Sequence, residues 1–169
     1  MKKIFVVMAL MMTTMLPVAA MAEETTEITD EQKNNIVANC DNIHNTLVVL
    51  QHNDSRTRVY LGRYYETILT DFITPLNVWL VGHNMSNAEL VENQNDFAAE
   101  RNNFVGEYIT YQKALEDLVA TDCKAEPAKF YDKLTNVRKL RAVVEKDVKK
   151  IRELMNEQVK LVTTLRETL

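Results

Sequence analysis

Hydrophobic residues recur at alternating spacings of three and four over most of the chain. One series of such positions begins at Ile36 and ends at Trp79, with a polar stretch between Leu50 and Leu61. These two leucines are eleven residues apart, which is about three full helical turns, so the same face continues beyond the stretch. The series consists of Ile36, Cys40, Ile43, Leu47, Leu50, Leu61, Tyr65, Ile68, Phe72, Leu76 and Trp79. It predicts one long helix over residues 30–81.

Two further series predict two more helices, over residues 87–122 and 127–168. The first consists of Leu90, Gln94, Phe97, Arg101, Phe104, Tyr108, Tyr111, Leu115, Leu118 and Asp122. The second consists of Phe130, Leu134, Val137, Val144, Val148, Ile151, Met155, Val162 and Leu165. Helix starts are marked by two capping-box spacings and a proline, namely Thr29 with Gln32, Ser86 with Glu89, and Pro127. Only three Gly and three Pro occur and no strand-like alternation persists, so the predicted fold class is all-α.

The predicted architecture is an elongated antiparallel three-helix coiled-coil bundle. The alternative is a four-helix bundle with a turn near residues 52–55. Cys40 and Cys123 are the only cysteines and lie symmetrically about Gly82, so a single hairpin there places them at one level. A turn near Asp54 would separate them by about 40 Å along the bundle, whereas a disulfide requires Cα atoms within about 7 Å. A bond between the two cysteines therefore favours three helices.

The N-terminal residues have the pattern of an export signal. Two lysines precede an apolar run that Pro17 ends, and small residues suitable for cleavage follow. The pattern predicts a cleaved signal peptide over residues 1–22, with an uncleaved anchor as the alternative. A flexible acidic leader over 23–29 and one bundle domain over 30–169 are expected to follow. We expect the mature chain to be extracytoplasmic (periplasmic, cell-surface or secreted), without a membrane span after cleavage.

The cysteines carry the first chemical prediction. An exported chain with two cysteines favours a disulfide bond between Cys40 and Cys123. One alternative is a disulfide to another chain. The other is a metal site in which His44 and Asp122 join the two thiolates. No second Cys–His pair is present, so we expect the bond and no metal.

Composition and charge narrow the classes of function. The sequence contains no catalytic constellation and no phosphate-cradling glycine loop, so we expect no enzyme activity and no cofactor. Residues 23–126 carry 18 acidic and 7 basic side chains, whereas residues 127–169 carry 6 and 11. We interpret the basic residues at 138–152 as one face of a helix beside two acidic ones. Export and the net acidic charge argue against nucleic acid, and a cell-wall polyanion is the alternative partner.

Residues 55–65 form the first candidate interaction surface. They include three arginines, three tyrosines and no acidic residue, and Arg and Tyr frequently anchor protein interfaces. The alternative is structural, with arginines paired to acidic residues of the other helices and the tyrosine rings buried. The hairpin tip at residues 78–81 is a second candidate because four consecutive apolar side chains cannot all face one core, and Pro75 should kink the helix before it. The candidate residues are Arg56, Arg58, Tyr60, Arg63, Tyr64 and Trp79.

Two stretches of the chain resemble segments of other proteins. SRTRVYLGRYYETILTDFITPLN and LEDLVATDCKAEPAKFYDKL resemble segments of small, uncharacterised exported all-helical proteins of reduced-genome candidate-phylum bacteria. The likeness spans roughly residues 36–140. It implies export and a helical fold, and it implies no activity.

These observations lead to two functional hypotheses. The first is an exported, non-enzymatic structural or protein-interaction module whose partner is another protein or a cell-surface component. The alternative is an extracytoplasmic ligand- or anion-binding module that uses residues 55–65. A cleft lined by Arg56, Tyr60 and Arg63 would favour the alternative, and a continuous packed seam there would favour the first hypothesis.

Overall fold

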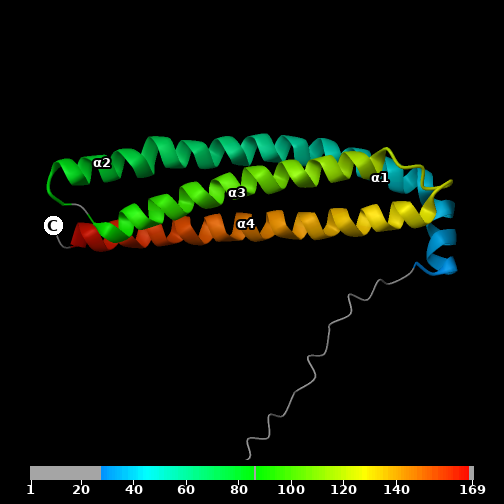
Figure 1. Cartoon of the computed structure of the whole chain (residues 1–169). Coiled ribbons are helices and arrows are strands. Elements are labelled where there is room, and N and C mark those ends of the chain that lie inside the picture. Colours follow the sequence, from blue (N-terminus) through cyan, green and yellow to red (C-terminus); the bar gives the residue numbers. More distant parts are fainter. Residues whose placement is uncertain (1–27, 86, 168–169) are drawn as a thin grey trace, which may run out of the picture.

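The protein folds into a bundle of three long helical rods. A computed structural model describes residues 28–85 and 87–167. Its elements are α1 (Asp30–Thr67), the π-helical turn η1 (Ile68–Ile73), α2 (Thr74–Gly82), α3 (Ala88–Val119) and α4 (Pro127–Glu167). Figure 1 shows α1, η1 and α2 as one rod beside α3 and α4, with successive rods running in opposite directions. The prediction of an all-α bundle of three helices is confirmed.

The boundaries of the elements test the finer predictions. The alternative turn near residues 52–55 is wrong, because α1 continues through it as regular helix. The predicted signal peptide over 1–22 and the leader up to residue 27 lie outside the described residues.

Side-chain caps position the helix starts. Before α1, the Thr29 backbone N–H donates to the Gln32 side chain at 2.8 Å, and the Gln32 N–H donates to the Thr29 hydroxyl at 3.2 Å. This predicted capping box is confirmed. The cap of α3 lies one residue later than predicted, because the side chain of Asn87 accepts the Glu89 N–H at 2.9 Å. Asn is as good an N-cap as Ser, so the spacing alone did not distinguish the two positions.

The disulfide closes the bundle at the end remote from the α2–α3 turn. Cys40 of α1 and Cys123 of the α3–α4 loop are bonded, with their Cα atoms 5.6 Å apart, which confirms the predicted pairing. Next to the bond, the Lys124 ammonium pairs with the Asp41 carboxylate at 2.8 Å. Helix α3 ends three residues before the predicted boundary, and Asp122 caps the loop instead. Hydrogen bonds from the backbone of residues 125 and 124 lower the pKa of its carboxyl group.

The π-helical turn corrects the predicted hydrophobic stripe. Within η1 the backbone is wound wider, and the Thr74 N–H donates to the carbonyl five residues back. A π turn inserts one extra residue into the helical repeat, so every later buried position moves one residue along the chain. The residues predicted to be buried, Phe72 and Trp79, are 66% and 50% exposed, whereas Ile73 and Leu80 are 3% and 2% exposed.

The π turn lies next to Pro75, the residue at which we predicted a kink. Pro75 has no backbone N–H and cannot continue the hydrogen-bond ladder of an α-helix. The π turn ends two residues before Pro75, and the helix then continues to Gly82, while the kink itself stays a prediction.

Aromatic side chains form the centre of the core. Tyr65 of α1 makes edge-on contacts with Phe97 and Phe104 of α3, at centroid distances of 6.4 and 5.4 Å. The contacts continue along α3 to Tyr108 and Tyr111. These rings fix α1 against α3 opposite the surface described next.

Candidate functional site

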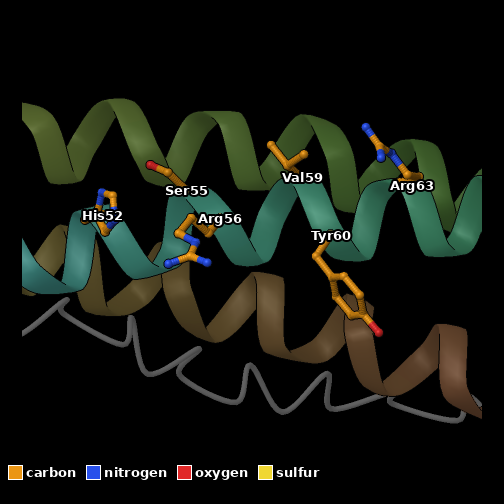
Figure 2. Close-up of a pocket in the computed structure, with 6 residues that line it drawn as sticks. All are labelled: His52, Ser55, Arg56, Val59, Tyr60 and Arg63. Atoms are coloured by element: carbon orange, nitrogen blue, oxygen red, sulfur yellow. The ribbon is translucent and has the colours of Figure 1, made fainter.

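The candidate site is the face of α1 that points away from the bundle. A hollow of about 550 Å³ lies on it and is lined by His52, Ser55, Arg56, Val59, Tyr60 and Arg63. Figure 2 shows that all six residues lie on α1, with Arg56 and Tyr60 extending from one edge of the helix and Val59 and Arg63 from the other. Val59 is 55% exposed and Tyr60 is 69% exposed. Among the described residues, the hollow is therefore an open surface of one helix.

Helical periodicity explains why these residues share a face. Five exposed positions follow one another at spacings of three and four: Val49, His52, Arg56, Val59 and Arg63. At about 100° per residue, this series lies opposite the series that includes the buried Leu47 and Tyr65. We call these five residues the outer seam. α1 thus has two seams, of which the inner one faces the core.

Two tyrosines flank the outer seam. The rings of Tyr60 and Tyr64 lie parallel, with an interplanar angle of 4° and centroids 6.3 Å apart. Tyr64 in turn contacts the buried Tyr65 at 5.8 Å. The exposed ring pair is thereby supported by the aromatic core, which reduces the conformational entropy that a bound partner would have to remove.

Arg58 is separate from this surface. It lies seven residues before Tyr65 and so falls on the inward side of α1, where its Nε atom is buried without a hydrogen-bond partner. Its charge acts on Tyr108 of α3, where it slightly offsets the larger effect of burial on the pKa of that phenol. Of the six predicted residues, the structure brings together Arg56, Tyr60, Arg63 and Tyr64 on the exposed face of α1.

A polar cluster beneath the site joins α1 to α3, and the sequence analysis did not identify it. The Tyr111 hydroxyl donates to the Asp54 carboxylate at 2.5 Å, and the Tyr108 hydroxyl donates to the Asp54 carbonyl at 2.9 Å. The Gln112 side chain donates to the Ser55 hydroxyl at 2.8 Å. Asp54 lies in phase with the buried series, between Leu50 and Leu61, and that phase was the available signal.

Electrostatics in this cluster keep both phenols protonated. Burial, followed by the negative charge of Asp54, raises the pKa of Tyr108 to about 12. Burial and the hydrogen bond to Asp54 also raise the pKa of Tyr111. A neutral phenol is a hydrogen-bond donor, so both tyrosines hold α1 in place across the physiological pH range.

An ion pair between α1 and α3 lies near the end of α1. Glu66 of α1 pairs with Arg101 of α3. This contact is made by an acidic residue of α1 and a basic residue of α3, which is the reverse of the pairing considered from the sequence.

Trp79 lies on a second exposed surface at the hairpin tip. It is sixteen residues beyond Arg63, or about 24 Å along a helix. Its ring packs on that of His83, with centroids 4.3 Å apart, and a His83 ring nitrogen lies 2.8 Å from the Trp79 carbonyl. An apolar hollow of about 250 Å³ lies nearby between η1, α2 and α4, lined by Phe72, Ile73, Leu76, Gln158, Val159, Val162 and Thr163.

The alternative metal site, with Cys40 and Cys123 as ligands, is not compatible with the disulfide bond. Cys40 and Cys123 are bonded to each other and cannot act as thiolates. Within residues 28–85 and 87–167, no group of three or more His, Cys, Asp or Glu side chains is arranged to hold a metal ion. In the same part of the chain, none of the helices combines the length and apolar character that crossing a membrane requires.

Comparisons with protein-family models, curated proteins and solved structures give no match to this chain.

Proposed function

We propose that this chain is an exported, non-enzymatic interaction module that presents the outer seam of α1 to another protein or to a cell-surface component. The observation that carries the proposal is the concentration of exposed Arg, Tyr and Val side chains on one rigid helix face. Arg and Tyr contribute strongly to binding when a partner covers them. The remaining exposed valines would supply apolar contact area.

The scaffold supports this role. The disulfide ties α1 to the α3–α4 loop, and the Asp54 cluster ties its middle to α3. A surface that is already ordered loses little conformational entropy when it binds. The heptad spacing of all three rods supports a coiled-coil type of packing.

Export is supported by three independent features. The N-terminal residues have the pattern of a signal peptide. A disulfide bond is compatible with an oxidising compartment. The resemblance of residues 36–140 to small exported helical proteins favours the same location.

The second candidate function is anion binding at the same face. It is favoured by the hollow that Arg56, Tyr60 and Arg63 help to line. Small-molecule sites, however, bury most of the ligand between walls that several elements provide, and this hollow is lined by one helix among the described residues. The geometry therefore favours a macromolecular partner over a small anion.

The test is a pull-down with the immobilised disulfide-bonded chain on proteins and wall components of the outer surface. The variant Val59→Ser with Arg63→Glu should lose the retained partner. A matched control, Val143→Ser with Arg138→Glu, changes one exposed valine and one exposed arginine of α4 and should retain it. Loss of the partner in both variants, or in neither, would show that the outer seam is not the interface.

A parallel thermal-shift screen distinguishes anion binding, the second candidate function, from binding of a protein. Phosphate, sulfate and short polyanions should leave the melting temperature unchanged if the partner is a protein. A shift that Arg63→Glu abolishes, together with no retained protein, would establish anion binding instead.

A further inference from the structure

We infer that the partner of the outer seam is an amphipathic α-helix with acidic flanks, which packs along α1 as a fourth helix. This inference rests on the proposed function and specifies the chemistry of the partner.

The outer seam has a spacing that suits packing against another helix. Its five positions follow the three–four repeat that helices use to interlock side chains. They run from Val49 to Arg63, which is about 21 Å along the axis. Among the residues that the structure describes, only residues of α1 line the hollow. An element that covers it must therefore lie along α1, and a helix does so at an axial distance of about 8–10 Å.

The charge of residues 55–65 favours an acidic partner. Residues 55–65 contain three arginines and no acidic residue, although residues 23–126 as a whole carry 18 acidic and 7 basic side chains. Arg56 and Arg63 are seven residues apart and both exposed, and their side chains extend from opposite edges of the outer seam (Figure 2). Carboxylates on both flanks of a partner helix would meet the two guanidinium groups.

The outer seam also exposes apolar side chains. Val49 and Val59 are 60% and 55% exposed, and the exposed Tyr60–Tyr64 ring pair adds aromatic surface at one edge of the seam (Figure 2). These side chains require apolar residues on the partner, placed between its carboxylates. Together, the two requirements describe an acidic amphipathic helix.

A second copy of this chain does not meet these requirements at this face. A symmetric dimer places the same surface on both sides of its axis. The outer seam carries Arg56, Arg63 and His52 and no carboxylate, so two copies would oppose like charges. A helix from a different protein is therefore the occupant that the chemistry selects.

The test uses three synthetic, fluorescently labelled peptides of three heptads. The first has Leu at a and d and Glu at e and g. The second has Lys in place of Glu. The third has the composition of the first in a scrambled order that cannot form an apolar stripe. Binding to the full-length, disulfide-bonded chain is measured by fluorescence anisotropy at low and high salt.

We expect the acidic amphipathic peptide to bind at least about tenfold more tightly than the other two, which corresponds to about 1.4 kcal/mol. The preference should weaken at high salt because exposed charges are screened. Arg56→Glu with Arg63→Glu should reverse the preference toward the lysine peptide. The control Arg138→Glu with Lys149→Glu on α4 should not change it, and circular dichroism should show all variants folded.

The outcomes separate this inference from the proposed function. If the scrambled acidic peptide binds as tightly as the amphipathic one, binding depends on negative charge and does not require an amphipathic helix, and the inference is wrong. If the pull-down depends on Val59 and Arg63 but no peptide binds, the inference is wrong and the proposed function stands. If peptide binding survives Arg56→Glu with Arg63→Glu, the acidic helix binds elsewhere and the inference is again wrong.

Discussion

Deleting one residue from the π turn should leave the fold intact, whereas the same deletion in α1 should destabilise it strongly. Thr70 of η1 and Thr57 of α1 form a matched pair. Both are exposed, and each hydroxyl donates to the carbonyl four residues back at 3.0 Å. Deleting Thr70 removes the extra residue of the π turn, so the rod becomes continuous α-helix. Ile73 and Leu80 then keep their inward orientation.

Deleting Thr57 has the opposite effect on the core. The residues between the deletion and η1 turn by about 100° relative to the bundle. This rotation removes Tyr65, which is 4% exposed, from its contacts with Phe97 and Phe104. Loss of a large core aromatic costs about 3–5 kcal/mol. At an unfolding entropy of about 2 cal/mol/K per residue, roughly 0.3 kcal/mol/K here, this corresponds to a fall in melting temperature of about 10–17 °C.

The assay combines thermal unfolding by circular dichroism with the fluorescence of Trp79, the only tryptophan. For the Thr70 deletion we expect a change within about 1 kcal/mol, or about 3 °C. The emission of Trp79 should keep the position typical of an exposed indole. Equal destabilisation by the two deletions would refute the reasoning. A blue shift on deleting Thr70 would also refute it, because Trp79 would then face the core.

Three further predictions concern stability. Replacing Cys40 and Cys123 by serine should lower the unfolding free energy by about 4–5 kcal/mol in the chain-entropy model, because the bond joins residues 83 positions apart; chemical denaturation measures this, and an unchanged midpoint would contradict it. Tyr111→Phe removes the hydrogen bond to Asp54 and should cost about 1–3 kcal/mol, whereas replacing an exposed tyrosine should cost much less. Burial, and then the neighbouring carboxylates of α3, raise the pKa of Asp147. The folded state therefore binds the extra proton in the window above about pH 4, and stability falls as pH rises through it. Asp147→Asn should be more stable than the parent at pH 7 and lose this part of the pH dependence; equal pH profiles would contradict it.

The candidate site was predictable in part. Arg56, Tyr60 and Arg63 lie out of phase with the hydrophobic series that ends at Trp79, so their exposure follows from spacing. Arg58 was grouped with them by composition, although its distance of seven residues from Tyr65 already indicates the inward side. The Asp54 cluster was missed because its tyrosine partners belong to another helix, and sequence separation hides such contacts.

The sequence alone indicated three helices, their approximate bounds and the buried face of the first rod as far as Tyr65. Regular apolar spacing specifies helices with one buried face, and the positions of Cys40 and Cys123 about Gly82 specify a single hairpin in the first half of the chain. Only the tertiary structure decided which residues near the tip are buried. Phe72 and Trp79 form one apolar series and Ile73 and Leu80 another, and each fits a helix that continues from Tyr65. The choice between them depends on packing against α3 and α4 and on the π turn at Ile68–Ile73, neither of which is encoded in local periodicity.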